Sequence, residues 1–345
     1  MTKIVHQKIY STLLVNDTSL LGHHGSAIVV DQIIDWAAGH GIKLVTGWDW
    51  SAVNKHIAEK LPFDAIIVNG EGSIHDNSDT TIQIVEIAKA CKKQKIPAYL
   101  INSSEERTGD ELIEGLKAFR LRYMRDTTSQ SNMTTRGVSS FLAHDLTLSW
   151  KDAPRAEGKG VTLITDSSVT NVTKRMIAMS RHIVGTRMIS LRTFPRWPNK
   201  GSLKRPISFL MKSMLSSLMK INAWSLRYRY SIKTRKNFVQ LLSQHSQGMI
   251  TARYHGVCLA LRFYLPFVAI EGNIKKIGSL LADVGLSNRL VPLEALENGT
   301  RINVMPFSTD EKALIQSFLQ RAERETEEMF SNIRQDLDQF YDNQI

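Results

Sequence analysis

Short apolar runs alternate with helical patterns along the first part of the chain. Six runs rich in Ile, Val, Leu and Ala predict buried strands, at residues 9–15, 43–46, 65–68, 98–102, 121–124 and 141–143. Three segments between them have the apolar spacing of helices, at residues 25–38, 49–59 and 80–93. Regular alternation of strand and helix predicts a parallel, doubly wound sheet, so residues 1–150 are expected to form a Rossmann-like domain.

A polar linker interrupts this alternation before it starts again. Residues 151–160 contain Pro, Gly and charged side chains. Beyond them, strands are predicted at residues 161–165, 188–191, 249–252 and 267–270, with a helix at 172–183. Residues 160–308 are therefore expected to form a second Rossmann-like domain. The predicted fold class is α/β, with two Rossmann-like domains and a cleft between them that holds the active site.

Two helical segments do not follow this alternation of strands and helices. Residues 195–235 combine many Lys and Arg with Leu, Met, Trp and Tyr, which predicts a basic amphipathic insert in the second domain. This insert is either a solvated helix pair with an ordinary buried face or a surface for an anionic membrane or a polyanionic acceptor. Residues 309–345 form a charged helical pattern with one apolar side, which is expected to pack across the outside or back onto the first domain.

Composition and charge narrow the class of protein. A formal net charge of +11 over 345 residues suits an anionic partner, such as a phosphorylated substrate. Cys91 and Cys258 lack the spacing of metal ligands or of a disulfide framework, so both are expected to be reduced thiols and no metal site is predicted. Neither a secretory signal nor an apolar run of roughly 18 residues is seen. We therefore expect a cytoplasmic protein, with a peripheral position on the inner face of the plasma membrane as a variant.

A glycine-containing turn follows the strand predicted at residues 65–68. Glycines at the carboxyl end of a strand let the backbone approach a ligand closely, and N–H groups there can hold an anion. The third glycine of a dinucleotide fingerprint is missing, which argues against NAD binding. Glu71 is a candidate general base toward a sugar hydroxyl, or else the solvated residue of a tight turn. The candidate substrate contacts of this turn are Asn69, Gly70, Gly72, Ser73 and His75.

The first predicted strand ends in a second polar stretch. Asn16 and Asp17 suit a turn that leads into the next helix, and a purely structural role explains them well. A structural role explains the adjacent His23 and His24 less well. Paired imidazoles at a helix N-terminus can hydrogen-bond a sugar or a phosphate, so all four residues are candidate substrate contacts.

The most informative stretch follows the strand predicted at residues 249–252. Arg253 and His255 lie at a strand-to-helix turn, where the helix N-terminus adds its own preference for anions. Arginine offers a planar donor fork for phosphate or carboxylate, and histidine can move a proton near neutral pH. His255 is therefore a candidate catalytic residue. The other substrate-binding candidates of this region are Arg253, Tyr254, Gly256, Glu271, Asn273, Lys275 and Lys276.

These stretches resemble the polysaccharide pyruvyl transferase family. Residues 251–286 closely resemble its C-terminal signature of an Arg-x-His-Gly turn, an apolar helix, a Pro-led strand, a Lys-Ile pair and a Gly-Leu. Asn16-Asp17 and residues 69–73 resemble its two N-terminal turns. A third pattern, Arg-Asp, Ser, Gly and Pro-Asp, is matched by Arg125-Asp126, Ser129, Gly137 and His144-Asp145, with His144 in place of proline. The resemblance touches most of the chain except residues 195–235.

The resemblance implies an architecture like that of the GT-B glycosyltransferases and a pyruvyl transfer. The donor is phosphoenolpyruvate, and two hydroxyls of a sugar or lipid-linked oligosaccharide receive the pyruvyl group as a ketal. The first domain is then the acceptor side and the second the donor side, with no further cofactor. The resemblance implies that Arg253 and His255 contact phosphoenolpyruvate, with His255 as general acid. It also implies that Arg125 contacts a substrate.

Two other functions are compatible with the sequence. A GT-B glycosyltransferase would use Glu271 to accept hydrogen bonds from a nucleotide ribose, and the lysines after it to hold a diphosphate. A basic nucleic-acid-binding protein is the non-enzymatic alternative. The charge allows it, but no recognised nucleic-acid motif is present, so no nucleic-acid partner is expected.

Overall fold

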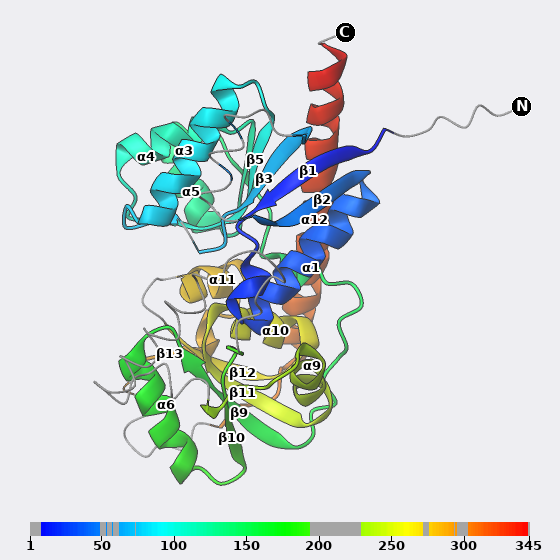
Figure 1. Cartoon of the computed structure of the whole chain (residues 1–345). Helices are drawn as coiled ribbons and strands as arrows, with labels where there is room; N and C mark the ends of the chain where they lie inside the picture. The colour runs from blue at the N-terminus through cyan, green and yellow to red at the C-terminus, as the bar shows by residue number, and fades with distance from the viewer. Residues whose placement is uncertain are drawn as a thin grey trace, which may run out of the picture. The chain divides into compact units, whose positions relative to one another are not determined.

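The chain folds into two compact units, each built on one parallel sheet (Figure 1). The computed structural model describes residues 8–48, 53, 57, 62–72, 74–193, 229–271, 276–292, 294 and 303–343. Unit 1 consists of Met1–Thr18, Ile28–Lys151 and Gln316–Ile345, and unit 2 consists of Ser19–Ala27 and Asp152–Ile315. Most of the helix predicted at 49–59 and of the basic insert predicted at 195–235 lies outside the described residues.

The sheet of unit 1 has the order β2-β1-β3-β5-β7-β8, and every pair is parallel. Its strands are β1 (Tyr10–Val15), β2 (Ile42–Trp48), β3 (Ala65–Asn69), β5 (Ala98–Ser103), β7 (Leu121–Met124) and β8 (Phe141–Leu142). From β1 the chain moves to one side for β2 and to the other side for β3. The topological switch point therefore lies between β1 and β3, and sheets of this kind bind ligands at the carboxyl ends of the strands there.

Helices cover both faces of this sheet and bury its strands on both sides. They are α1 (His24–Gly39), α3 (Asp79–Lys93), α4 (Asp110–Gly115), α5 (Thr127–Thr135) and α12 (Thr309–Asp342), with short turns η2 (Leu116–Ala118) and η3 (Leu146–Ser149). The turn η1 (Thr18–Leu21) starts at the last residue of the first segment of unit 1. Leu13 faces the core under α3, whereas the next residue, Leu14, faces the core under α1 and α12. Burial on both faces explains why these strands are continuous apolar runs.

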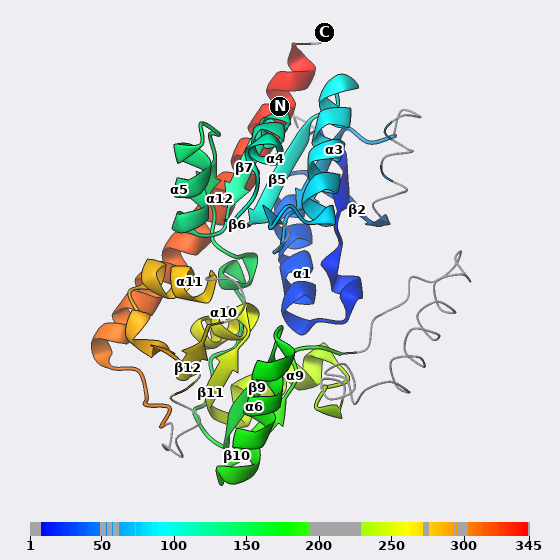
Figure 2. The ribbon, with the colours of Figure 1, turned by 90° about the vertical axis from the view of Figure 1, so that its left-hand side faces the viewer.

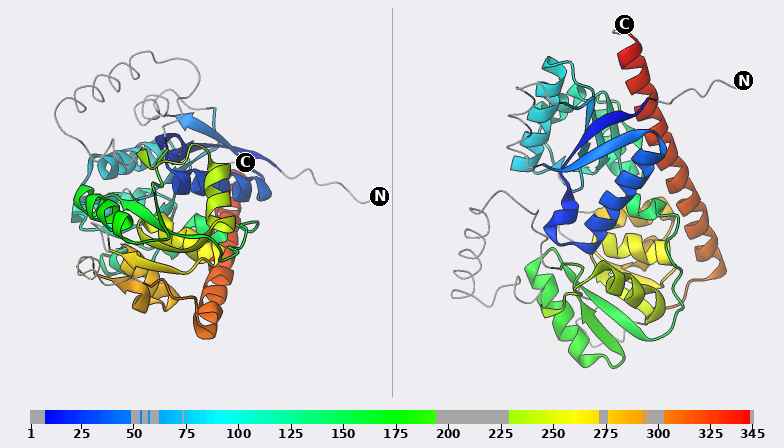
Figure 3. Two further views of the ribbon diagram at one scale, coloured as in Figure 1. Left: turned by 90° about the horizontal axis from the view of Figure 1, so that it is seen from below. Right: turned by 45° about the vertical axis from the view of Figure 1, so that its right-hand side comes forward.

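Helix α12 contributes its C-terminal part to the core of unit 1, on the same face as α1 (Figure 3). Met329, Phe330, Ile333 and Leu337 are its buried apolar residues. Two buried tyrosines of the sheet donate hydrogen bonds to its acidic side, from the Tyr10 hydroxyl to Asp338 and from the Tyr99 hydroxyl to Asp336, both at 2.7 Å. The helix is thus fixed to the sheet by an apolar stripe with a polar border.

The first turn of α12 belongs to unit 2 and is held by a capping box. The Glu311 N–H donates to the Ser308 hydroxyl at 3.1 Å, and the Ser308 N–H donates to the Glu311 carboxylate at 2.9 Å. Arg289 also bonds this carboxylate, with 2.6 Å between Nη2 and Oε2. The hydrogen bond from Arg289 is the main reason that the pKa of Glu311 is lowered to about 2.

The sheet of unit 2 repeats the same topology in the order β10-β9-β11-β12-β13, again with all pairs parallel. Its strands are β9 (Val161–Ser167), β10 (Thr186–Ile189), β11 (Ser246–Ala252), β12 (Phe267–Ile270) and β13 (Leu290–Val291). Its helices are α6 (Thr170–His182), α9 (Arg235–Gln244), α10 (Tyr254–Phe263) and α11 (Lys276–Val284), with the turn η4 (Ser287–Arg289) (Figure 2). The switch point here lies between β9 and β11.

One short segment of the N-terminal region is built into unit 2. The Thr193 N–H donates to the Gly22 carbonyl at 2.7 Å, and the His24 N–H donates to the Leu191 carbonyl at 2.9 Å. These bonds make Ser19–Ala27 part of unit 2, although the sequence pattern extends the first domain unbroken over residues 1–150. Within the described part of the chain, no helix combines the length and the apolar character needed to cross a bilayer.

His144 occupies the place where the resembled family has proline, and it is tied to α12. Its side chain is fully buried. Its backbone N–H donates to the Glu325 carboxylate at 3.1 Å, and its Nδ1 lies 2.5 Å from the same oxygen. A proline could make neither contact, because it lacks both the N–H group and the imidazole. Glu325 therefore compensates for the departure from the family pattern.

We predict that Glu325→Ala lowers the free energy of unfolding by about 1–3 kcal/mol, because two buried donors of His144 lose their acceptor. The same change should lower the free energy of unfolding only slightly in a His144→Pro background, because those donors are missing there. The measurement is a double-mutant cycle by chemical denaturation. An equal loss in both backgrounds would show that Glu325 acts through other contacts.

Candidate active site

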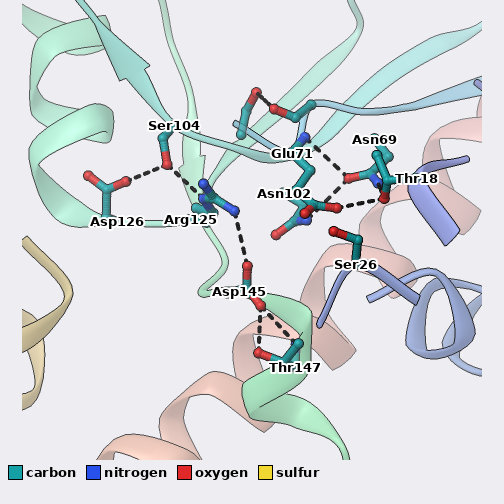
Figure 4. A network of polar contacts seen from close by, with 12 residues as sticks. Thr18, Ser26, Asn69, Glu71, Asn102, Ser104, Arg125, Asp126, Asp145 and Thr147 are labelled. Carbon is teal, nitrogen blue, oxygen red and sulfur yellow. Dashed lines mark hydrogen bonds and ion pairs between the residues drawn. The ribbon is translucent and has the colours of Figure 1, made fainter. Parts of the chain in front are cut away.

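Three asparagines meet at the carboxyl ends of adjacent strands in unit 1. Asn16 follows β1, Asn69 ends β3 and Asn102 is the last residue but one of β5, and these three strands lie side by side in the sheet. Figure 4 shows Asn69 and Asn102. Asn16 Nδ2 donates to the Asn69 carbonyl at 2.6 Å, and Asn102 Nδ2 donates to Asn69 Oδ1 at 3.1 Å. Asn69 is fully buried and Asn102 is 1% exposed. Polar side chains thus fill the switch point of the first sheet.

Glu71 is attached to this edge by a hydroxyl. The Thr18 hydroxyl donates to Glu71 Oε2 at 2.6 Å, and the Glu71 N–H donates to Asn69 Oδ1 at 3.3 Å. Both glycines of the turn are structurally required. A Cβ atom on Gly70 would lie 2.0 Å from the Ser103 hydroxyl oxygen, and Gly72 has a φ of +61°. The turn therefore presents a partly exposed carboxylate at a defined place.

The remaining predicted residues of this region are distributed differently. Asp17 is partly exposed next to Asn16, and Ser73 lies outside the described residues. His75 lies on β4 (Ile74–His75), which pairs with β6 (Glu105–Glu106) in a separate two-stranded sheet. Its Nδ1 lies 3.1 Å from the Asp76 carboxylate. The described contact of the His75 imidazole is thus with Asp76 and not with the asparagine group.

Arg125 is a buried arginine with a carboxylate partner. It follows β7, is 1% exposed, and forms an ion pair with the fully buried Asp145 at 3.1 Å between Nη1 and Oδ2. Its Nε donates to the Ser104 hydroxyl at 2.7 Å. The expectation of a substrate contact for Arg125 stays a prediction, and in the free protein its guanidinium is enclosed by these partners. A buried guanidinium needs a carboxylate partner, and Asp145 is that partner.

The Arg-Asp, Ser and Asp pattern of the resemblance is one connected network in the fold (Figure 4). Asp126 caps α5 by accepting from the Ser129 N–H at 2.8 Å, and it also accepts from the Ser104 hydroxyl at 3.0 Å. Asp145 accepts from the Thr147 N–H at 3.0 Å and from its hydroxyl at 2.7 Å. Residues far apart in the sequence thus support the same edge of the sheet.

In unit 2, Arg253 is held by a partner that the sequence analysis did not identify. Asp166 lies at the end of β9 and is fully buried, and Arg253 follows β11 and is 7% exposed. Arg253 Nε donates to Asp166 Oδ1 at 3.2 Å, and Nη2 donates to Oδ2. The pair spans the strands of the switch point. It orients the guanidinium, because a bidentate fork fixes its plane.

His255 and His23 lie next to each other beside this ion pair. Their ring centroids are 5.3 Å apart. A Cβ atom on Gly25 would lie 2.4 Å from the Cβ of His255, so glycine is needed for this approach. The Ser26 N–H donates to His23 Nδ1 at 3.2 Å, which places the hydrogen of the neutral ring on Nε2.

Electrostatics favour the neutral form of His23. Burial is the largest cause that lowers its pKa well below the ordinary value, and electrostatic interactions with His255, Arg253 and Arg192 lower it further. A neutral His23 with hydrogen on Nε2 is a hydrogen-bond donor. Together with two arginines and His255, it makes this part of unit 2 suited to an anion.

Tyr254, Gly256 and Lys276 extend this group. The Tyr254 ring meets the His255 ring edge-on at 5.8 Å, and Lys276 Nζ lies 5.7 Å from the centre of the Tyr254 ring. A Cβ atom on Gly256 would lie 2.2 Å from the Thr251 hydroxyl oxygen, so glycine lets α10 start close to β11. Unit 2 thus brings together six of the predicted residues, namely His23, Arg253, Tyr254, His255, Gly256 and Lys276.

Two further candidates have structural contacts, and two are not described. Glu271 Oε2 accepts from the Gly278 N–H at 2.8 Å, in the first turn of α11. His24 is 2% exposed, stacks on Phe238 at 4.4 Å between ring centroids, and lies 2.9 Å through Nε2 from the Ile232 carbonyl. Asn273 and Lys275 lie outside the described residues.

The residues that sequence reasoning missed are mainly partners of the predicted ones. Thr18 holds Glu71, Asn102 bonds Asn69, and Asp166 pairs with Arg253. A signal was present for two of them, since Asn102 and Asp166 each stand at or after the end of a predicted strand. In the described part of the chain, no group of three or more His, Cys, Asp or Glu side chains is arranged to hold a metal ion.

Solved structures similar to this chain are glycosyltransferases of the GT-B class. UGT2 of Phytolacca americana, without ligand, has a TM-score of 0.52 and 8% identity, and the match covers 95% of this chain and 100% of that one. UGT89C1 of Arabidopsis thaliana, complexed with UDP-L-rhamnose, has a TM-score of 0.54 and 8% identity, with 95% and 99% covered. This likeness is one of fold, and it confirms the predicted fold class of Rossmann-like units of the GT-B kind.

Sequence similarity identifies the family. No curated protein matches the chain. The polysaccharide pyruvyl transferase family matches residues 21–273, which is more than half of the 345 residues. The matched range includes Asn69, Glu71, Asp166, Arg253 and His255. The chain therefore belongs to the polysaccharide pyruvyl transferase family.

Proposed function

We propose that this protein transfers a pyruvyl group from phosphoenolpyruvate to two hydroxyls of a sugar, in a cell-surface polysaccharide or its lipid-linked precursor. Family membership supports the reaction class. The observation that carries the proposal is the group of Arg253, His255 and His23 at the switch point of unit 2, because it joins anion-binding donors to a group that can move a proton.

The donor suits this group chemically. Phosphoenolpyruvate has a phosphate and a carboxylate, and both accept hydrogen bonds from charged donors. Among the described residues, Arg253 uses Nε and Nη2 for Asp166, which leaves Nη1 for a ligand oxygen. His23 offers its Nε2 hydrogen, and Lys276 supplies an ammonium group 5.7 Å from the centre of the Tyr254 ring, which also contacts His255.

The reaction needs an acid and a base. Two sugar hydroxyls add to C2 of phosphoenolpyruvate, and each gives up one proton. One of these protons passes to the methylene carbon of the donor, and the other leaves with phosphate. We assign the acid role to His255, since it lies beside Arg253 in sequence and beside His23 in space. We assign the base role to Glu71, which Thr18 orients through its hydroxyl at 2.6 Å. The reaction is proposed to run in the cytoplasm.

The direct test is phosphate release from phosphoenolpyruvate by the purified full-length chain. The acceptors are lipid-linked oligosaccharides prepared from the source organism's own surface glycan. We expect release that depends on both donor and acceptor, with a pyruvyl ketal on the sugar. No release with any of these acceptors, together with a thermal shift by nucleotide sugars and none by phosphoenolpyruvate, would favour the glycosyltransferase alternative.

Arg253→Lys should weaken phosphoenolpyruvate binding by about tenfold or more, because lysine keeps the charge but lacks the fork that bonds Asp166 and a ligand together. Isothermal titration measures this affinity. Arg253→Ala is the less informative change. It leaves the buried Asp166 carboxylate without its partner, which should cost about 3–5 kcal/mol of stability.

A matched control for this variant is Arg289→Lys. Arg289 is also 7% exposed and also bonds one carboxylate through Nε and Nη2, that of Glu311. The Arg289→Lys variant should lose about as much stability as Arg253→Lys, but it should keep its affinity for phosphoenolpyruvate. If both variants bind the donor as the wild type does, Arg253 is a structural residue.

Glu71→Gln should lower kcat by about 10²–10⁴-fold, because the amide cannot accept a proton, while donor affinity stays unchanged. The amide oxygen can still accept the Thr18 hydroxyl, so the turn should keep its conformation. Initial rates of phosphate release and donor titration measure the two effects separately. A variant with full activity would reduce Glu71 to a turn residue.

A further inference from the structure

Asn102 has an amide orientation that the surrounding hydrogen bonds dictate. Asn69 Nδ2 lies 3.4 Å from the Asn16 carbonyl, which can only accept, and Asn69 Oδ1 lies 3.3 Å from the Glu71 N–H, which can only donate. Asn69 therefore has one allowed orientation. Because Asn69 Oδ1 lies 3.1 Å from the Asn102 amide, the atom of Asn102 that faces it must be the donor Nδ2.

This orientation turns the Asn102 oxygen away from the asparagine group. Asn102 is 1% exposed, and its Oδ1 accepts no hydrogen bond from the described residues. A buried acceptor without a donor costs about 1–3 kcal/mol, so such atoms are rare unless a ligand or an ordered water satisfies them. The atom lies at the carboxyl end of β5, next to β3 and the Glu71 turn.

The backbone of Asn102 is also in an unusual conformation. Its φ is 56°, in the left-handed region, and Asn16 on β1 has a φ of 64°. Such conformations cost energy for residues other than glycine and gather at binding sites. Asn16 and Asn102 lie on either side of Asn69, and both donate hydrogen bonds to it through their side chains.

The atoms beside Asn102 suggest the class of ligand. Figure 4 draws the Glu71 carboxylate and the Asn102 amide in one network of polar contacts. The Glu71 backbone N–H and Asn102 Nδ2 bond the same atom, Asn69 Oδ1, so the Glu71 turn is joined to the Asn102 side chain. The Glu71 carboxylate and Asn102 Oδ1 are both acceptors, so this network suits a ligand with neighbouring donors. The hydroxyls of a sugar meet that requirement.

We propose that Asn102 binds the sugar acceptor, by accepting a hydrogen bond at Oδ1 from one hydroxyl while Glu71 takes the proton of a neighbouring one. This inference rests on the proposed function for the role of Glu71. It makes Asn102 a specificity-determining residue, because a sugar that lacks this hydroxyl leaves the buried oxygen without a donor. Neighbouring side chains must shift to admit the hydroxyl, since the oxygen is enclosed in the free protein.

The test combines one variant with a series of sugars. The probes are methyl glycosides of glucose, galactose, mannose and their N-acetylamino forms, followed by the monodeoxy derivatives of whichever binds the full-length protein best. Asn102→Gly removes the side chain while glycine tolerates the positive φ. In the wild type, one deoxy position should weaken binding by about 5- to 15-fold. Asn102→Gly should bind the parent glycoside more weakly than the wild type does, by that same factor. It should bind the deoxy derivative about as well as the wild type binds that derivative.

Asn77→Gly is the matched control. Asn77 also has a positive φ, of 51°, but it is exposed, and its Oδ1 accepts from the Gly109 N–H at 2.6 Å. This variant should lose stability without changing the affinity for any glycoside. Thermal unfolding of both variants separates loss of fold from loss of binding.

Several outcomes would overturn the proposal. A wild type that binds none of the glycosides, with or without phosphoenolpyruvate, contradicts it, and so does a wild-type deoxy series in which no single hydroxyl matters. If the deoxy effect is equal in the wild type and in Asn102→Gly, the oxygen is satisfied by water and has a structural role. Because these are equilibrium binding measurements, they stand whether or not phosphate is released, so a failure of the pyruvyl-transfer proposal is seen separately.

Discussion

In a parallel sheet every strand ends at the same edge, and the rest of this structure depends on that constraint. Where successive connections leave in opposite directions, the strand ends are not covered by a crossover, and side chains from two neighbouring strands can meet there. Unit 1 has this point between β1 and β3, and unit 2 has it between β9 and β11. The asparagine group and the Arg253–Asp166 pair lie at these two points.

Buried charges are the second feature that organises both units. Arg125–Asp145 in unit 1 and Arg253–Asp166 in unit 2 are nearly or fully enclosed. Removing ions from water is costly, so each guanidinium is stable in the interior only because a carboxylate and further donors or acceptors surround it. Both arginines follow a strand directly, at positions 125 and 253. Their surroundings differ, because Arg125 is enclosed by Asp145 and Ser104, whereas Arg253 lies near the imidazoles of His23 and His255.

Several polar groups in the two units act through partners. Thr18 fixes the carboxylate of Glu71, Ser26 fixes the tautomer of His23, and Asp166 fixes the plane of Arg253. None of these partners is assigned a proton transfer in the proposed reaction. They reduce the number of orientations open to the groups that do, and oriented groups need less rearrangement when a substrate arrives.

The amino-acid sequence by itself determined the succession of strands and helices, since apolar runs such as 65–68 must be buried on both faces. It also determined where glycines permit close approach, as at Gly70 and Gly256, and which short patterns identify the family. The tertiary structure decided which polar residues become partners. Asp166 and Arg253 are 87 positions apart, and Asn69 and Asn102 are 33 apart, so no local pattern joins them. Their contacts arise only when strand order brings the ends of separated strands together. For the same reason the burial of Arg125 and His24 could not be predicted from the sequence, because burial is a property of the packed fold and not of the turn in which a residue stands.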